Sequence, residues 1–235
     1  MVKPMSDTRS DYRILVAEHA LGILESVIKA KKLPIPVNWK KAQELHSQTR
    51  SALMQIKFSF MPPTMLAHSE LAKRLQELAR ELAAVLLPRE WLEKTQIDQK
   101  TRRTIAEIKY AIRTLYGLPA RLSLGDDNDP LYAVDIECVE VLSVAKHPNA
   151  DNLYITRAKG VFTYTIVTNI KDVRKGDLRA AAILPPVDLR GQLSEAMYCS
   201  RGRIESGCTA GKRPPVNGIE RSEVEKIIYS IVKGK

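Results

Sequence analysis

The sequence predicts a multidomain protein, with an all-α N-terminal four-helix bundle, an all-β C-terminal barrel and a short terminal helix. Two observations predict this class. In the first half, apolar residues recur every three or four positions, which marks one face of a helix. In the second half, short stretches alternate apolar and polar residues between glycine-containing turns, which is typical of strands.

Four segments of the first half have helical periodicity, at about residues 10–32, 38–57, 64–87 and 97–116. In the first segment Ile14, Ala17, Leu21, Leu24 and Ile28 follow spacings of 3, 4, 3 and 4. Pro or Gly follows each segment, and Asn38 suits the N-cap of the second. Four such helices with short connections favour an antiparallel bundle over residues 1–122, with the apolar stripes as its core.

Residues 123–130 are polar and acidic and include Gly125 and Pro130, so we predict a solvated linker. Alternation then predicts a small barrel over residues 131–204, with a bulge where the apolar face shifts near Val139 and Val141. Its strands are expected at 134–144, 153–158, 163–168, 178–184 and 196–199. Residues 205–235 form a C-terminal extension that ends in a short helix.

The charge of the chain favours an anionic partner. The formal net charge is +10 with a pI near 9.5, and residues 1–122 hold 21 Lys and Arg against 12 Asp and Glu. Nucleic acid is the first expectation and an anionic membrane the second. No apolar run reaches the ~20 residues of a membrane-spanning helix. The first residues carry no signal-peptide pattern, so a cytoplasmic protein without a membrane partner is expected.

The sequence contains no pattern of catalytic or metal-binding residues. Its three cysteines form no CxxC pair, and Cys138 lies in a strand pattern, where we expect a small buried side chain. The four histidines are scattered, and neither GxSxG nor HExxH occurs. We therefore expect a protein that is not an enzyme and needs no metal or cofactor.

The stretch Lys146–Tyr154 is predicted to be the turn between the first two strands. Pro148 fixes its own φ and pushes the preceding residue toward extended geometry. Asn149, Asp151 and Asn152 can close the turn by hydrogen bonds from side chain to backbone. Leu153 and Tyr154 then begin the alternation of the next strand.

Four segments of the second half, in order, resemble the signatures of one family. Residues 147–154 (HPNADNLY) are similar to HP(D/N)AD(K)L(Y), and residues 165–170 (TIVTNI) to TIVSGL. Residues 189–191 match LRG, and residues 194–197 (SEAM) are similar to SEGM. Together they resemble the tRNA-binding domain family. That family includes the C-terminal domain of methionyl-tRNA synthetases, free-standing tRNA-binding proteins and cofactors of the endothelial-monocyte-activating-polypeptide type.

The resemblance implies an OB-fold barrel that binds the outside corner of tRNA by shape rather than by sequence. It also implies an appended module or a homodimer. A barrel of this kind presents a strand face and two loops to nucleic acid. We therefore expect a non-catalytic tRNA-binding protein, an accessory subunit of an aminoacyl-tRNA synthetase, with methionyl-tRNA synthetase first.

The resemblance also assigns RNA-binding positions in this chain. Lys146 and Arg190 would contact phosphate, and Met197 would lie against a base or fill the barrel. Glu195 would brace a loop. Asn152 stands where the family usually has Lys, which removes one phosphate contact. The full set is Lys146, His147, Asn149, Asn152, Tyr154, Thr168, Asn169, Arg190, Ser194, Glu195 and Met197.

Three other functions stay open at this point. A peptide-binding chaperone shares this barrel family and would need an exposed apolar groove. A scaffold would dock a synthetase through the bundle or the terminal helix, with RNA contact incidental. An enzyme acting on tRNA through the helical half would need an acid–base or metal cluster that the sequence does not show.

Overall fold

A computed structural model describes residues 7–92 and 97–234 of the chain. The chain divides into two compact units, which we name the helical unit (residues 1–133 and 228–235) and the strand unit (residues 134–227). The first six residues of the predicted bundle and the last residue of the predicted extension lie outside the described ranges. Helices in the first unit, and strands with a short terminal helix after them, confirm the coarse prediction of the fold.

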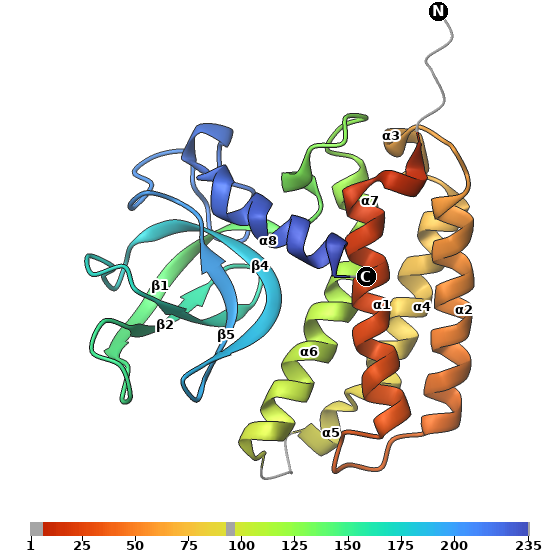
Figure 1. Ribbon diagram of the computed structural model, residues 1–235, viewed down its shortest axis with the longest axis horizontal. Coiled ribbons are helices and arrows are strands. Elements are labelled where there is room, and N and C mark those ends of the chain that lie inside the picture. Colours follow the sequence, from red (N-terminus) through yellow and green to blue (C-terminus); the bar gives the residue numbers. More distant parts are fainter. Residues whose placement is uncertain (1–6, 93–96, 235) are drawn as a thin grey trace, which may run out of the picture. The chain divides into compact units, whose positions relative to one another are not determined.

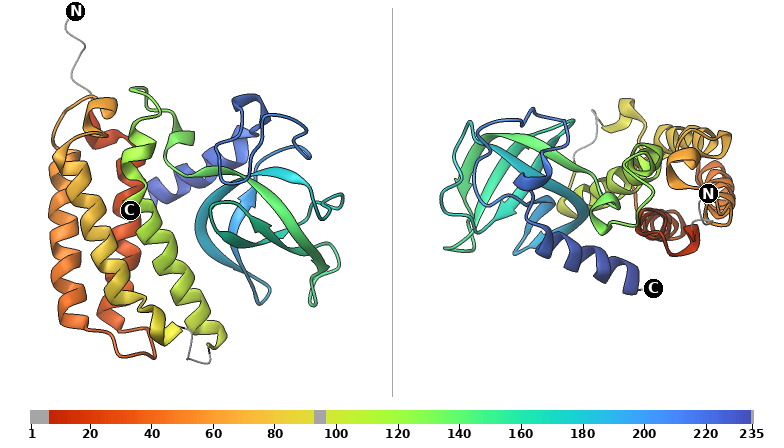
Figure 2. Two further views of the ribbon diagram at one scale, coloured as in Figure 1. Left: turned by 180° about the vertical axis from the view of Figure 1, so that it is seen from behind. Right: turned by 90° about the horizontal axis from the view of Figure 1, so that it is seen from above.

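The helical unit is built on four long helices that lie side by side (Figure 1, Figure 2). They are α1 (Tyr12–Ala30), α2 (Trp39–Lys57), α4 (Glu70–Leu86) and α6 (Gln99–Tyr116). Helix α1 packs against α2 and α6, and α4 packs against the same two, so the four close a ring around one core. Shorter elements are η1 (Thr8–Ser10), α3 (Pro63–Leu66), α5 (Arg89–Leu92), α7 (Leu118–Leu122) and η2 (Pro130–Tyr132).

Side-chain caps fix where these helices begin. Asn38 caps α2 as predicted, because its Oδ1 accepts a hydrogen bond from the Lys41 N–H at 3.0 Å. Ser69 was not predicted as a cap. It accepts from the Ala72 N–H and donates to the Leu66 carbonyl, and so divides the expected helix 64–87 into α3 and α4. The apolar stripe from Ile14 to Ile28 is buried, as its spacing predicts.

Residues 123–130, which we predicted to be a solvated linker, belong to the helical unit and form hydrogen bonds with it. Asp126 accepts hydrogen bonds from the Thr64 N–H and hydroxyl, and Asn128 accepts from the Tyr12 N–H. The guanidinium of Arg13, only 1% exposed, donates to the carbonyls of Gly125 and Asp127. Side chains and carbonyls of this segment therefore form hydrogen bonds with the helical unit, although Ser123, Leu124, Asp127 and Asn128 are exposed.

The strand unit is one antiparallel sheet of five strands in the order β3-β2-β1-β4-β5, and the sheet is strongly curved (Figure 1, Figure 2). The strands are β1 (Ile136–Lys146), β2 (Tyr154–Lys159), β3 (Thr163–Thr168), β4 (Leu178–Leu189) and β5 (Gln192–Tyr198). The β1–β2 register shifts between Val141 and Ser143, so β1 has an irregularity a few residues after the change of apolar face between Cys138 and Val139. Val139, Val141 and Ile166 face the core.

A closed barrel is not formed, because the strand pairing leaves β3 and β5 as the two edges of the sheet. Side chains of β5 nevertheless reach the β3 backbone. The Ser194 hydroxyl accepts from the Val167 N–H at 3.0 Å, and the Glu195 carboxylate accepts from the Thr165 N–H at 2.9 Å. These bonds satisfy backbone donors that an edge strand would otherwise leave to solvent.

Cys138 is not the unpaired buried side chain that the sequence suggested. It forms a disulfide with Cys208, 70 residues later, with their Cα atoms 5.6 Å apart. The Cys138 N–H donates to the Lys212 carbonyl, and the Cys138 carbonyl accepts from the Gly211 N–H. Residues 208–212 are therefore held along the start of β1, a pairing that no local pattern could predict.

The chain ends with η3 (Val216–Gly218) and α8 (Arg221–Lys233), the predicted terminal helix. The last part of α8 belongs to the helical unit, where Tyr229 lies against Tyr12 with ring centroids 5.7 Å apart. Within the described ranges, no helix combines the length and the apolar character that crossing a bilayer requires.

Candidate nucleic-acid interface

The β1–β2 turn is held by a histidine. The His147 N–H donates to the Leu153 carbonyl, and the His147 Nδ1 accepts from the Asn149 N–H, both at 3.0 Å. Since Nδ1 accepts, Nε2 carries the proton and donates to the Leu189 carbonyl at 3.0 Å. His147 as a whole is only 5% exposed. His147 therefore ties the β1–β2 turn to the end of β4, with both ring nitrogens in hydrogen bonds.

The β4–β5 turn is a two-residue hairpin turn with a left-handed backbone. Leu189 pairs with Gln192, and the two residues between them, Arg190 and Gly191, have φ of 54° and 89°. This is the type I′ geometry of a two-residue hairpin, in which glycine is favoured at the second position. The Gly191 N–H also donates to the Asp188 carboxylate at 2.8 Å. The turn therefore presents the Arg190 side chain to solvent.

The two turns lie against each other. The Asn149 side-chain amide donates to the Arg190 carbonyl, and the Arg190 guanidinium donates to the Asn149 carbonyl, both at 3.4 Å. With the bond from His147 to Leu189, three hydrogen bonds join the turns. Residues about 40 positions apart in the sequence thus form one surface.

The end of β3 completes this surface. Lys146 pairs with Tyr154, and Tyr154 pairs with Thr168, so the three residues stand in register across β1, β2 and β3. Asn169 follows directly and is exposed. We name the two turns together with the adjoining strand ends, residues 146–154, 168–169 and 189–195, the turn surface.

Burial divides the residues that the sequence assigned to RNA. The exposed ones are Lys146, Asn149, Asn152, Asn169 and Arg190. Tyr154, Glu195 and Met197 are half-buried. Ser194 is 7% exposed, and its hydroxyl also donates to the Ala196 carbonyl, so both its hydrogen-bonding functions are used. The hydroxyl of buried Thr168 accepts from the Ile170 N–H. The exposed residues are available to a ligand, whereas the buried ones hold the backbone.

Three exposed cations near these strands were not assigned from the sequence. Arg157 lies on β2 between Ser143 and Thr165, and Lys159 pairs with Thr163. Lys171 follows Asn169 by two positions. None of the three forms an ion pair within the described part of the chain. The predicted alternation in residues 153–158 puts Arg157 on the same side as Leu153 and Ile155, so that pattern did not mark Arg157 as part of this surface.

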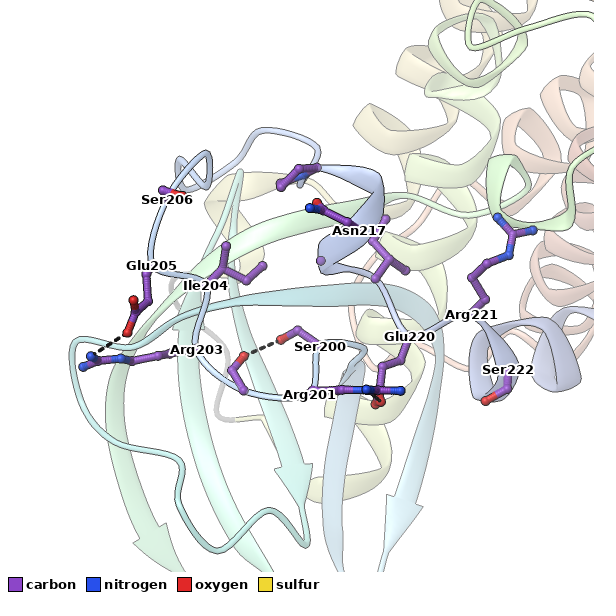
Figure 3. A pocket seen from close by; sticks show the side chains of 14 residues that line it. Ser200, Arg201, Arg203, Ile204, Glu205, Ser206, Asn217, Glu220, Arg221 and Ser222 are labelled. Atoms are coloured by element: carbon purple, nitrogen blue, oxygen red, sulfur yellow. Dashed lines mark hydrogen bonds and ion pairs between the residues drawn. The ribbon is translucent and has the colours of Figure 1, made fainter.

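A separate hollow of about 780 Å³ lies in the C-terminal part of the strand unit, lined by residues 200–206, 215 and 217–222. Figure 3 shows Arg203 against Glu205 and Arg201 against Glu220, and both pairs have N–O distances of 2.9 Å. Arg221 pairs with Glu225. Because its arginines are matched by carboxylates, this hollow attracts a polyanion less than the turn surface does.

A family described as an alpha helical domain matches residues 5–125, which is more than half of the chain. The chain therefore belongs to that family. The matched residues include helices α1 to α7 of the helical unit, and the description of the family gives a fold and no activity. No curated protein matches the chain.

Proposed function

We propose that this protein binds tRNA through the turn surface, by shape and by phosphate contacts, and carries out no chemical step. We further propose that it is a cytoplasmic accessory subunit of an aminoacyl-tRNA synthetase, with methionyl-tRNA synthetase first. A homodimer is part of the same expectation. This function rests on the resemblance of residues 147–197 to tRNA-binding domains and on the geometry of those residues.

The observation that carries the proposal is the joining of the two turns. Residues from separate signature segments, around His147, Leu189 and Arg190, meet through three hydrogen bonds. The buried members fix the backbone, while Lys146 and Arg190 stay exposed without a carboxylate partner in the described part of the chain. A fixed arrangement of cations and amides suits a folded RNA, which is bound through its phosphates and hydroxyls.

The strand order supports an OB-type barrel as part of this proposal. The order β3-β2-β1-β4-β5 places β3 and β5 at the two edges, and β5 side chains bond the β3 backbone. A five-stranded, partly open barrel of this kind uses one face and two loops for oligonucleotides.

The test removes the exposed cations of the turn surface. Arg190→Asn keeps the left-handed backbone, which Asn tolerates, and Lys146→Ala removes a side chain from a strand end. Each variant is expected to weaken tRNA binding and to lower the salt dependence by about 0.9 per lost phosphate contact. The matched control is Lys212→Ala, an exposed cation beside the opposite end of β1. Equal effects of all three substitutions on tRNA binding would contradict the proposal that the turn surface is the binding site.

Protein docking is the second function that an observation favours. Val161 and Phe162, at the β2–β3 turn, are 58% and 60% exposed. Such apolar side chains suit a protein partner more than a polyanion. Competition between tRNA and an unfolded client protein separates the two functions, because a chaperone would release one when it takes up the other.

A further inference from the structure

A second feature suited to nucleic acid, besides the turn surface, lies in the helical unit at the connection between α1 and α2. This connection joins the lower ends of both helices in Figure 1. A hollow of about 280 Å³ lies there, and every residue that lines it belongs to the helical unit. Its volume is at the lower limit of the roughly 300–1,000 Å³ of small-molecule sites. It therefore suits one nucleotide better than a dinucleotide. The lining residues are Glu25, Ile28, Lys29, Lys31, Trp39, Gln43 and His46.

The walls combine an aromatic surface with unused polar atoms. Trp39 is partly buried against the core and Ile28 is 6% exposed, so this part of the wall is apolar. His46 is 8% exposed, and its Nε2 donates to the Leu21 carbonyl at 3.1 Å. Its Nδ1 has no partner in the described part of the chain. In the neutral ring that nitrogen accepts a hydrogen bond, as from a base amine or a ribose hydroxyl.

The surroundings of the hollow are strongly cationic. Residues 29–41 contain five lysines and no Asp or Glu. Lys29 is paired with Glu25 at 2.6 Å, and the Lys32 ammonium donates to the Ser26 hydroxyl. The other three, Lys31, Lys40 and Lys41, are exposed and form no ion pair within the described ranges. These three charges are therefore available to phosphates.

Lys31 has a backbone conformation that is more usual for glycine or asparagine than for lysine. It ends α1 in the left-handed region, with φ 50° and ψ 47°, where Gly or Asn is usual. Its N–H donates to the Ile28 carbonyl, and its side chain lines the hollow. This unusual backbone places a cationic side chain in the wall of the hollow.

We propose that this hollow binds one unstacked nucleotide of a single-stranded RNA segment. The base lies against Trp39, His46 and Gln43 contact its polar edge or the ribose, and Lys31, Lys40 and Lys41 contact the adjoining phosphates. Stacking on an aromatic ring beside a positive surface is how proteins bind single strands without sequence preference. The inference takes from the proposed function only the expectation that the ligand is RNA, and the site is separate in sequence from the turn surface.

The experiment uses the fluorescence of Trp39 in the full chain. The protein has two tryptophans, so Trp91→Phe at an exposed position leaves Trp39 as the single reporter. Titration with an eight-nucleotide oligoadenylate at low salt is expected to quench this fluorescence. In this background Lys31→Asn is expected to reduce the salt dependence of the quenching curve by about 0.7. Lys109→Ala, which removes an exposed cation outside the hollow, should leave the curve unchanged.

A variant without the tryptophan tests the stacking itself. Trp39→Leu keeps an apolar side chain against the core and is expected to weaken oligoadenylate binding, followed by anisotropy of a labelled oligonucleotide, by about tenfold or more. Absence of quenching, or equal affinity of Trp39→Leu and the parent, would overturn the proposal. Quenching by free adenosine monophosphate at the same concentrations would overturn the assignment to an RNA chain.

The outcome is independent of the turn surface. If Arg190→Asn leaves tRNA binding intact while oligoadenylate still quenches Trp39, the proposed function fails and this inference stands. If Arg190→Asn weakens tRNA binding while Trp39 does not respond, the inference fails and the proposed function stands.

Discussion

In the helical unit, core side chains such as Leu21, Leu24 and Ile28 lie three or four positions apart on one helix, and all three are buried. In the strand unit, the contacts that fix the shape join residues far apart in the chain. Ser194 and Val167 are 27 positions apart, His147 and Leu189 are 42 apart, and the two disulfide cysteines are 70 apart. A local sequence pattern can therefore predict the core of the helical unit, but not the long-range contacts that fix the strand unit.

Each unit contains a buried arginine that binds a nearby carboxylate, and in the helical unit that arginine also binds backbone carbonyls more than 100 positions away. Arg13 in the helical unit pairs with Asp11 at 2.6 Å and bonds carbonyls of residues 121–127. Arg179 in the strand unit pairs with Asp177 at 3.1 Å and with Asp172 at 3.5 Å. Both guanidinium groups are 1% exposed. Arg13 therefore connects residues far apart in the sequence, whereas Arg179 binds carboxylates within seven positions of itself.

The largest effect is expected at Arg13. Arg13→Ala leaves the Asp11 carboxylate buried and unpaired and removes donors from several carbonyls, so the free energy of unfolding should fall by about 3–5 kcal/mol. Urea unfolding followed by circular dichroism measures this loss. Arg9→Ala, which breaks the exposed pair with Asp7, should change the unfolding curve little. A similar curve for both variants would show that the linker segment is not held by Arg13.

The disulfide comes next and should act on the strand unit. Cys208→Ala opens a 70-residue loop, so stability should fall by about 2–4 kcal/mol. If the two units unfold separately, calorimetry should show the transition of the strand unit at a lower temperature and the transition of the helical unit unchanged. Thiol titration supplies the control. Burial raises the pKa of Cys199 to about 12, so the native oxidised protein should react with no thiol reagent at pH 8, and the unfolded oxidised protein with one equivalent.

Ser194 tests whether a residue of the turn surface supports the fold or contacts RNA. Ser194→Ala leaves the Val167 N–H without its acceptor, so stability should fall by about 1–3 kcal/mol. The tRNA affinity, measured well below the melting temperature, should stay within a factor of about two. A large loss of tRNA affinity with unchanged stability would show that Ser194 contacts the RNA.

The smallest expected effect is a dependence of the stability of the strand unit on pH. Burial raises the pKa of Glu137 above its usual 4.5, although the Val161 N–H that donates to it acts in the opposite direction. Glu137 therefore ionises at a lower pH in the unfolded chain than in the folded protein. Its contribution to stability falls as the pH rises from about 4.5 to the pKa of Glu137 in the folded protein. Glu137→Gln should remove this falling limb in a series of melts. The exposed Glu140→Gln on the same strand should retain it.

The sequence predicted what depends on neighbours along the chain. Helical spacing located α1, α2 and α6 to within a few residues, and the turn before Tyr154 was found from Pro148 and its amide neighbours. It did not predict the partners of Arg13, the Cys138–Cys208 bond or the closeness of Asn149 and Arg190, because each depends on the finished fold. The same holds for the hydrogen bonds of the Ser194 and Thr168 hydroxyls with the backbone, while the assignment of both residues to RNA stays a prediction.

The most direct test of the central proposal is the affinity of the full protein for unfractionated tRNA across a salt series, compared with duplex RNA of similar length. Recognition through the turn surface predicts that tRNA is preferred near physiological salt and that Arg190→Asn removes the preference. Equal affinities for both RNAs, with a steep salt dependence and no binding left at about 200 mM, would show that charge alone attracts RNA. That result would contradict shape recognition and favour a scaffold.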